Sequence, residues 1–214
     1  IGAGHRTYSL ILSIKKRQKE NTKSIAILSP TFHRDKFDII CSPSHDKDKF
    51  KRINNVIFFE GSLARVSDKD TDENTVMIAV GGKNKHFAFD EDHIISQIDY
   101  FISIHPNKNC YIFNSRRTPS STNQKLASLK SIYENVIFCD LNVGSNNFGQ
   151  ILEKASSKLI TRDSVNMIFE SLSCKGKTYL IDMKENQSSN KVVKIVDDLI
   201  KNKKVGFIDC DNIV

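Results

Sequence analysis

Leu159–Tyr179, LITRDSVNMIFESLSCKGKTY, is predicted to form a strand, a turn and a helix, which is the repeating unit of an α/β fold. The apolar run ends at Thr161, and Asp163 and Ser164 are residue types that cap helix N-termini. Apolar residues then recur at the spacing of an amphipathic helix, at Val165, Ile168, Phe169 and Leu172. Gly176 marks the expected end of this helix.

The polar face of this helix is a candidate ligand site. Three- and four-residue steps keep its members on one side, opposite the apolar stripe: Asp163, Asn166 or Met167, and Glu170. The free N–H groups of Ser164 and Val165, with the helix dipole, suit a phosphate, and Glu170 can accept hydrogen bonds from sugar hydroxyls. An ordinary amphipathic helix with solvated polar residues explains the same pattern.

Strand and helix patterns alternate along the whole chain. Apolar strands are predicted at residues 24–28, 37–41, 55–59, 75–80, 110–114, 136–140 and 178–183. Further helices are predicted at residues 8–16, 90–104, 124–133, 151–155 and 192–200. This alternation predicts an α/β fold with parallel sheets flanked by helices on both faces and ligands at the carboxyl ends of the strands.

The stretch Ser67–Asn74, SDKDTDEN, contains no apolar residue and is predicted to be a linker. It divides the chain into two Rossmann-like domains, at residues 1–67 and 75–214. The chain begins at Ile1-Gly-Ala-Gly, directly on what resembles a strand-to-helix turn. We therefore expect the first domain to lack a preceding strand.

Composition narrows the classes of function. The chain has 214 residues, 39% of them hydrophobic, a net charge of +7 and a pI near 9.1. A basic chain suits nucleic acid, an anionic membrane surface or phosphorylated small molecules. There is no tryptophan, and no stretch interleaves aromatic with basic residues, so we expect no nucleic-acid partner.

The cysteines are scattered and mostly adjoin apolar runs, as buried thiols do: Cys41, Cys110, Cys139, Cys174 and Cys210. Without CxxC pairs or histidines at ligand spacing, neither a disulfide framework nor a metal site is predicted. No apolar stretch reaches the roughly twenty residues of a membrane-spanning helix. We expect a reducing, cytoplasmic location, with peripheral membrane attachment left open.

Five ordered motifs resemble the bacterial branch of the mitochondrial fission Elongated Mitochondria family. They are IGAGHRT, FDIICSPSHD, GGKNKHFAFDE, SRRTP and TRDSVNMIFESL, and they span nearly the whole chain. Two loops depart from the family pattern, because Lys83 replaces a frequent proline and Cys174-Lys-Gly-Lys-Thr replaces small residues followed by Gly and Pro.

The resemblance implies two Rossmann-like domains of the GT-B glycosyltransferase type. In that type a nucleotide-sugar donor lies against the second domain, and an acceptor approaches from the first across the interdomain cleft. The plant branch of the family is implicated in recruiting fission machinery, a role that needs binding and no chemistry. Three functions therefore stay open: a metal-independent glycosyltransferase, a binding or scaffold protein acting in membrane or organelle division, and a member without activity. The acceptor could lie at a membrane surface. No oligomeric state is indicated.

Several residues are candidates for the nucleotide diphosphate sugar, the expected donor; no other cofactor is predicted. Arg116 and Arg117 follow a strand, and their guanidinium groups suit a diphosphate. Lys85 and His86 can stabilise a leaving diphosphate where other transferases use a metal ion. The full candidate set is Gly81, Gly82, Lys85, His86, Ser115, Arg116, Arg117, Thr118, Asp163, Ser164, Met167 and Glu170.

Catalytic candidates lie in the first domain. His45 can act as a general base near neutral pH, with the adjacent Asp46 fixing its tautomer. Each of these residues can instead cap a turn. His5, beside Arg6 and Thr7, is an equal candidate for a base or a phosphate contact.

Overall fold

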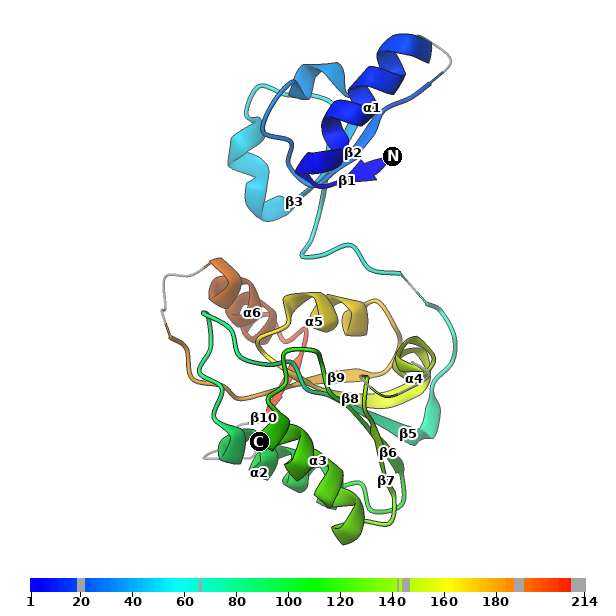
Figure 1. Cartoon of the computed structure of the whole chain (residues 1–214), viewed down its shortest axis with the longest axis vertical. Coiled ribbons are helices and arrows are strands. Elements are labelled where there is room, and N and C mark those ends of the chain that lie inside the picture. The colour runs from blue at the N-terminus through cyan, green and yellow to red at the C-terminus, as the bar shows by residue number, and fades with distance from the viewer. Residues whose placement is uncertain (19–21, 66, 142, 144–146, 187–190, 209–214) are drawn as a thin grey trace. The chain divides into compact units, whose positions relative to one another are not determined.

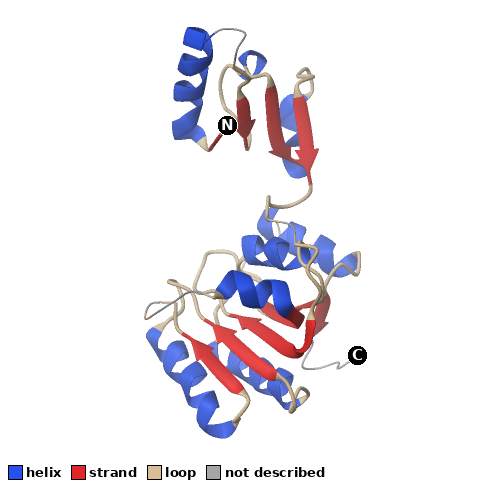
Figure 2. Cartoon of the chain, turned by 90° about the vertical axis from the view of Figure 1, so that its right-hand side faces the viewer, coloured by secondary structure: helices blue, strands red, loops and turns tan. Residues whose placement is uncertain are grey.

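The computed structural model folds into two compact units, Ile1–Leu63 (unit 1) and Ala64–Val214 (unit 2) (Figures 1 and 2). It describes residues 1–18, 22–65, 67–141, 143, 147–186 and 191–208. Each unit has a parallel sheet with helices packed against it. The predicted α/β fold with two parallel sheets is therefore confirmed. Cys210 lies outside the described residues.

Unit 1 is built on a four-stranded parallel sheet in the order β1-β2-β3-β4. Its elements are β1 (Gly2–Ala3), α1 (His5–Gln18), β2 (Ile25–Ile27), the 3-10 helix η2 (Arg34–Lys36), β3 (Ile39–Pro43), the 3-10 helix η3 (Ser44–Phe50) and β4 (Val56–Phe59). Gly4, at φ +83°, makes the turn into α1, where Thr7 N–H donates to the Gly4 carbonyl at 3.1 Å. The small core gathers Tyr8, Ala26, Phe37, Ile40 and Phe50.

Unit 2 has a six-stranded parallel sheet in the order β10-β9-β8-β5-β6-β7. Its strands are β5 (Asp72–Ala79), β6 (Asn109–Phe113), β7 (Val136–Cys139), β8 (Ala155–Thr161), β9 (Lys177–Ile181) and β10 (Gly206–Ile208). Its helices are α2 (Glu91–Ser103), α3 (Ser120–Ile132), α4 (Phe148–Lys154), α5 (Val165–Leu172) and α6 (Lys191–Lys201). Helices α2 and α3 cover one face and α4, α5 and α6 the other (Figure 1).

The strand order reverses direction at the pair β5 and β8. From β5 the chain adds β6 and β7 on one side, then returns to add β8, β9 and β10 on the other. The buried strands supply a continuous core, because Val76–Val80 in and after β5 are fully buried. In parallel sheets ligands bind at such a reversal, outside the carboxyl ends of the strands.

The structure divides the chain shortly before the predicted linker. The division between the units falls at Leu63 and Ala64, before Ser67–Asn74. Within unit 2, Ser67 N–H donates to the Ser173 carbonyl at 3.0 Å, and Asp72 already begins β5. The stretch lacks apolar residues because its strand portion is exposed and its charges pair on the surface, as in the 2.7 Å ion pair of Asp70 with Lys175.

Candidate functional site

Gly81 and Gly82 follow β5 and lie tightly against the loops after β6 and β8. Gly81 N–H donates to Thr161 Oγ1 at 2.7 Å, and Gly82 N–H donates to Asp163 Oδ2 at 3.0 Å. A Cβ at Gly81 would collide with the Asp163 carboxylate, and one at Gly82 with the backbone carbonyl of Arg117. The two glycines therefore serve close packing between loops, and their N–H groups are already engaged within the protein.

Asp163 ties the same three loops together. Its side chain has 0% exposed surface, and its Oδ2 also accepts a hydrogen bond from the Arg117 guanidinium at 2.9 Å. Asn84 Nδ2 donates to the Asp163 backbone carbonyl at 3.3 Å. Its other oxygen, Oδ1, is buried and has no hydrogen-bond partner among the described residues. A phosphate placed beside this carboxylate would meet a second negative charge. The structure thus uses Asp163, predicted on the ligand face, as an internal tie between loops.

The loop after β6 is shaped by its own hydroxyl groups. Ser115 N–H donates to Thr118 Oγ1 at 2.8 Å, and Arg117 N–H donates to Ser115 Oγ at 3.2 Å. Thr118 is buried, and its hydroxyl also contacts the Gly81 carbonyl. Ser115 and Thr118 therefore position Arg116 and Arg117 on the turn. Both arginines are exposed, but Arg117 pairs with Asp163, whereas Arg116 has no such partner among the described residues.

The loop after β5 bends around the Asn84 side chain. Asn84 Oδ1 accepts hydrogen bonds from His86 N–H at 2.6 Å and from Phe87 N–H at 3.0 Å. Phe87 then pairs with Glu185 in an antiparallel bridge, so this loop is joined to the one after β9. His86 Nδ1 is buried and has no hydrogen-bond partner among the described residues. This fixed bend leaves Lys83 and Lys85 exposed on either side of Asn84.

Lys83, Lys85 and Arg116 are the cations that this arrangement leaves available. All three are exposed, and their side chains form no hydrogen bond or ion pair with the described residues. They lie on the loops after β5 and β6, which the Arg117–Asp163 pair and the Thr118 hydroxyl hold together. The result is a positively charged edge on a rigid support. Lys83 was not among the predicted site residues.

Helix α5 presents its N-terminus near this edge. Ser164 is the N-cap residue, as predicted, although its side chain makes no capping hydrogen bond. Glu170 is half-buried, and that burial raises the pKa of its carboxyl group. Met167 packs against the hydrophobic core of unit 2. Of the predicted polar face, Met167 therefore belongs largely to the core, and Glu170 stays a predicted ligand contact.

The candidate catalytic residues of unit 1 lie beside its sheet. His45 and Asp46 belong to η3, and His45 Nε2 is 3.9 Å from Asp46 Oδ1. Asp46 Oδ2 accepts a hydrogen bond from Ser29 Oγ at 2.6 Å, and Asp46 Oδ1 pairs with Lys49 at 2.9 Å. His5 begins α1 and contacts Thr31 through Nδ1 at 3.2 Å. Asp46 is thus an anchored carboxylate with a histidine beside it.

Two classes of site have no candidate in the described ranges. No group of three or more His, Cys, Asp or Glu side chains is placed to hold a metal ion there. Nor does any described helix have the length and apolar character needed to cross a membrane.

Comparison with known protein families identifies the family of the chain. The family model described as mitochondrial fission ELM1 matches residues 1–209. The chain belongs to this family. A protein of Rickettsia prowazekii (strain Madrid E), "Uncharacterized protein RP120", is 26% identical to this ELM1-family chain over 250 residues. That alignment covers 95% of the chain and 69% of the Rickettsia protein.

Solved structures show a weaker likeness to the ELM1-family chain. MurG of Acinetobacter baumannii has a TM-score of 0.45 at 9% identity, covering 99% of this chain and 61% of that one. TarM has a TM-score of 0.42 at 8% identity, covering 94% of this chain and 47% of that one. The GtfA/B complex has a TM-score of 0.43 at 8% identity, covering 97% of this chain and 45% of that one. The chain spans less than two thirds of each of these structures.

Two buried cations of the ELM1-family chain escaped the sequence analysis. Arg162 follows β8, its side chain is 7% exposed, and it lies among several acidic and aromatic partners: Asp182, Glu185, Asp197, Phe87 and Phe207. Lys158 in β8 is fully buried and donates to the carbonyls of Ser171 at 2.9 Å and Lys175 at 2.7 Å. The available signal in the sequence was the charged Lys158 within a strand. A charged residue inside a strand that is buried throughout must be paired.

Proposed function

We propose that this chain binds a nucleoside diphosphate sugar at the carboxyl edge of the unit 2 sheet and acts as a glycosyltransferase-like protein. The observation that supports this is the set of exposed cations, Lys83, Lys85 and Arg116, on loops held together beside the strand reversal. A diphosphate carries charge that such cations neutralise, and paired N–H donors of a guanidinium match its oxygens.

The other parts of the ligand find partners nearby. The first-turn N–H groups of α5 and the positive end of its dipole favour a phosphate oxygen near Ser164. Glu170, held half-buried on the same helix, accepts hydrogen bonds from ribose hydroxyls. Lys85 and His86 stabilise the departing diphosphate without a metal ion. On the acceptor side, His45 with Asp46 fixing its tautomer, or His5, serves as the general base.

A non-catalytic binding or scaffold protein is the second candidate. One observation favours it: the N–H groups of Gly81 and Gly82 already donate hydrogen bonds to Thr161 and Asp163. A glycine loop that cradles a phosphate directs such groups outward toward the ligand. In this second function the same cationic edge recognises an anionic partner, and no bond is broken.

A thermal-shift titration of the purified protein with nucleotides and nucleotide sugars tests the proposal, because a ligand selective for the folded state raises the melting temperature. Arg116→Ala is expected to weaken binding about tenfold, since a hydrogen bond to a charged group contributes roughly 1.5–3 kcal/mol. Lys130→Ala, which removes an exposed lysine on α3, is the control and should leave binding unchanged.

Glu170→Ala separates ribose from phosphate recognition. A 2′,3′-dideoxy nucleotide should be nearly indifferent to this substitution and remain sensitive to Arg116→Ala. Release of nucleoside diphosphate from the sugar donor distinguishes the enzyme from the scaffold. If no nucleotide at millimolar concentration shifts the melting temperature, the nucleotide-binding proposal is wrong.

A further inference from the structure

Arg162 and Asp163 are consecutive residues in the turn after β8, and their side chains contact opposite ends of one loop. Asp163 accepts a hydrogen bond from Gly82 N–H at 3.0 Å, at the start of the loop after β5. The guanidinium carbon of Arg162 lies 5.2 Å from the centroid of the Phe87 ring, at the end of that loop. The candidate cations of the loop lie between these two contacts. One turn of the chain therefore holds both ends of this loop.

The buried Arg162 guanidinium also holds the segment that follows β9. Its Nη1 donates to the Met183 carbonyl at 3.3 Å and to Asp182 Oδ1 at 3.4 Å. Its Nη2 lies 3.5 Å from Glu185 Oε1 and 2.8 Å from Asp197 Oδ1 on α6. Because a guanidinium presents several N–H groups in one rigid plane, a single side chain joins three separate parts of unit 2.

The segment after β9 is in turn bonded to the far end of the loop after β5. Ala88 N–H donates to the Lys184 carbonyl at 2.8 Å, and Asn186 N–H donates to the His86 carbonyl at 2.9 Å. Between these two bonds lies the antiparallel bridge of Phe87. The guanidinium that fixes this segment therefore also fixes the backbone of the loop.

Three carboxylates surround Arg162, so its removal would leave uncompensated negative charge. Glu185 and Asp197 pair with no other cation among the described residues, and Asp182 has the His93 ring at 3.6 Å. An apolar side chain of similar size would fill the space but leave these carboxylates to repel one another. The segment after β9 would then shift, and the loop after β5 would shift with it.

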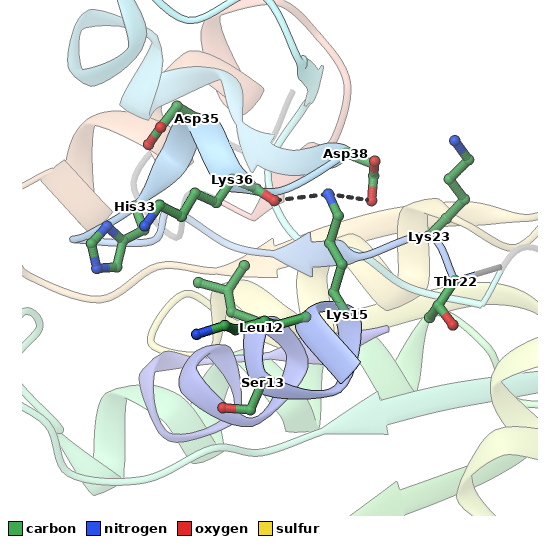
Figure 3. A pocket seen from close by; sticks show the side chains of 10 residues that line it. Leu12, Ser13, Lys15, Thr22, Lys23, His33, Asp35, Lys36 and Asp38 are labelled. Atoms are coloured by element: carbon green, nitrogen blue, oxygen red, sulfur yellow. Dashed lines mark hydrogen bonds and ion pairs between the residues drawn. The ribbon is translucent and has the colours of Figure 1, made fainter. Parts of the chain in front are cut away.

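The Lys15–Asp38 ion pair of unit 1 differs because it is open to solvent. Lys15 Nζ lies 2.9 Å from Asp38 Oδ2 and donates to the Lys36 carbonyl at 2.9 Å, in an open groove of about 950 Å3 (Figure 3). The two side chains are 30% and 25% exposed, so water screens the pair and its loss has a small effect. The contacts of Arg162 are shielded from water, and their loss has a larger effect.

We propose that Arg162 is a positioning residue of the nucleotide site, which holds the loop after β5 so that its cations meet the diphosphate. This inference rests on the function proposed for unit 2. Lys83 and Lys85 have long, flexible side chains, and ordering them on a ligand costs less when their backbone is already fixed. Arg162 is buried against Phe87 and Phe207, so it acts on the ligand through the loop and not by contact.

Calorimetric titration of the purified protein with ADP, GDP, UDP and inorganic pyrophosphate tests the role of Arg162. Arg162→Met should weaken the tightest of these complexes about tenfold, the scale of effects that pass through packed neighbours of a site. Arg162→Lys should weaken it by a smaller factor. An ammonium group keeps the charge but loses the fork that reaches Met183 and Asp197 together.

Amide hydrogen exchange measures the loop directly and needs no ligand. In both variants the amides of Ala88 and Asn186 should exchange faster relative to that of Met77, in the buried strand β5. Unchanged exchange at these two amides would overturn the positioning role, even with weaker binding.

Two control variants separate positioning from a general loss of stability. Leu129→Ala opens a cavity in the core at the last turn of α3, and Lys15→Met removes the exposed ion pair of unit 1. Both should keep wild-type affinity. Weakening by Leu129→Ala equal to that by Arg162→Met would assign the effect to stability and overturn the proposal.

The nucleotide site and the role of Arg162 fail in different ways. If none of the four probes binds the wild type, the nucleotide site is wrong, and the binding role of Arg162 is wrong with it. If the wild type binds and both Arg162 variants bind equally well, only the role of Arg162 is wrong. Wild-type affinity in Arg162→Lys beside weak binding in Arg162→Met would show that charge alone suffices, which also overturns the positioning role.

Discussion

Asp163 in unit 2 and Asp46 in unit 1 are both buried aspartates that come just after a strand, yet they are held differently. Asp163 has no exposed side-chain surface and binds partners from two other loops, Gly82 and Arg117. Asp46 is 11% exposed in its side chain and pairs with Lys49 on its own 3-10 helix and with Ser29. The first carboxylate therefore links three loops of unit 2, whereas the second is held by partners that lie closer to solvent.

Substitution of Gly82 tests the packing around Asp163 most severely. Gly82→Ala is expected to destabilise the protein by about 3 kcal/mol, because the new Cβ meets the rigid backbone carbonyl of Arg117. Gly149→Ala in α4 is the control, since a Cβ there meets nothing within 4 Å, and it should be neutral or slightly stabilising. Urea unfolding at constant pH measures both. Similar effects of the two substitutions would remove the packing argument.

Neutral replacement of the two aspartates compares them directly. Asp163→Asn should cost about 2 kcal/mol, because the fully buried side chain loses its charged contact with the half-exposed Arg117 and the amide cannot satisfy every partner. Asp46→Asn should cost about 1 kcal/mol, because Lys49 and His45 are closer to solvent. Unfolding free energies of the two variants give the comparison. If Asp46→Asn is the more costly, the distinction drawn between the two residues is wrong.

Unit 2 contains a second buried charge, the ammonium group of Lys158, whose effect on stability depends on pH. Burial lowers the pKa of its ammonium group to about 8 from 10.5. The unfolded chain therefore binds more protons between these values, so the contribution of Lys158 to stability rises with pH, by about 1 kcal/mol between pH 7 and 9. Melting curves over this range, compared with Lys158→Met, isolate the effect. The rise should disappear in the variant, and a rise of equal size there would assign it to other groups.

The alternation of strands and helices was predictable because apolar runs and helical spacing report burial directly. Short or polar elements were not: β10 (Gly206–Ile208) was missed, and the predicted helix at residues 151–155 is α4, which ends where β8 begins at Ala155. The buried Ser156 and Ser157 conceal the start of β8, since their polarity resembles that of a loop. The strand propensity of the residues carries little information in such segments, because pairing with neighbouring strands decides whether they form a strand.

The location of the candidate site at the carboxyl ends of the strands stays a prediction from the sequence. In the structure the loops that carry Gly82, Arg117 and Asp163 are joined by direct hydrogen bonds. The sequence does not reveal that these groups form hydrogen bonds with one another, because the residue types that bind a phosphate also join loops together. That distinction depends on burial, and it leaves Lys83, Lys85 and Arg116 as unpaired cations on the loops after β5 and β6, within the described residues.

The central place of β5 has a consequence for synthesis of the chain. β5 is the first strand of unit 2 to be made, and one of its edges receives β6 soon afterwards. Its other edge stays open until β8 has been made, after α2, β6, α3, β7 and α4. During that interval a strand of wholly apolar character, Val76–Ala79, exposes unpaired backbone groups, which is a surface that other nascent strands can join. Unit 2 should therefore depend on chaperones, or on slow translation, more than its finished stability suggests.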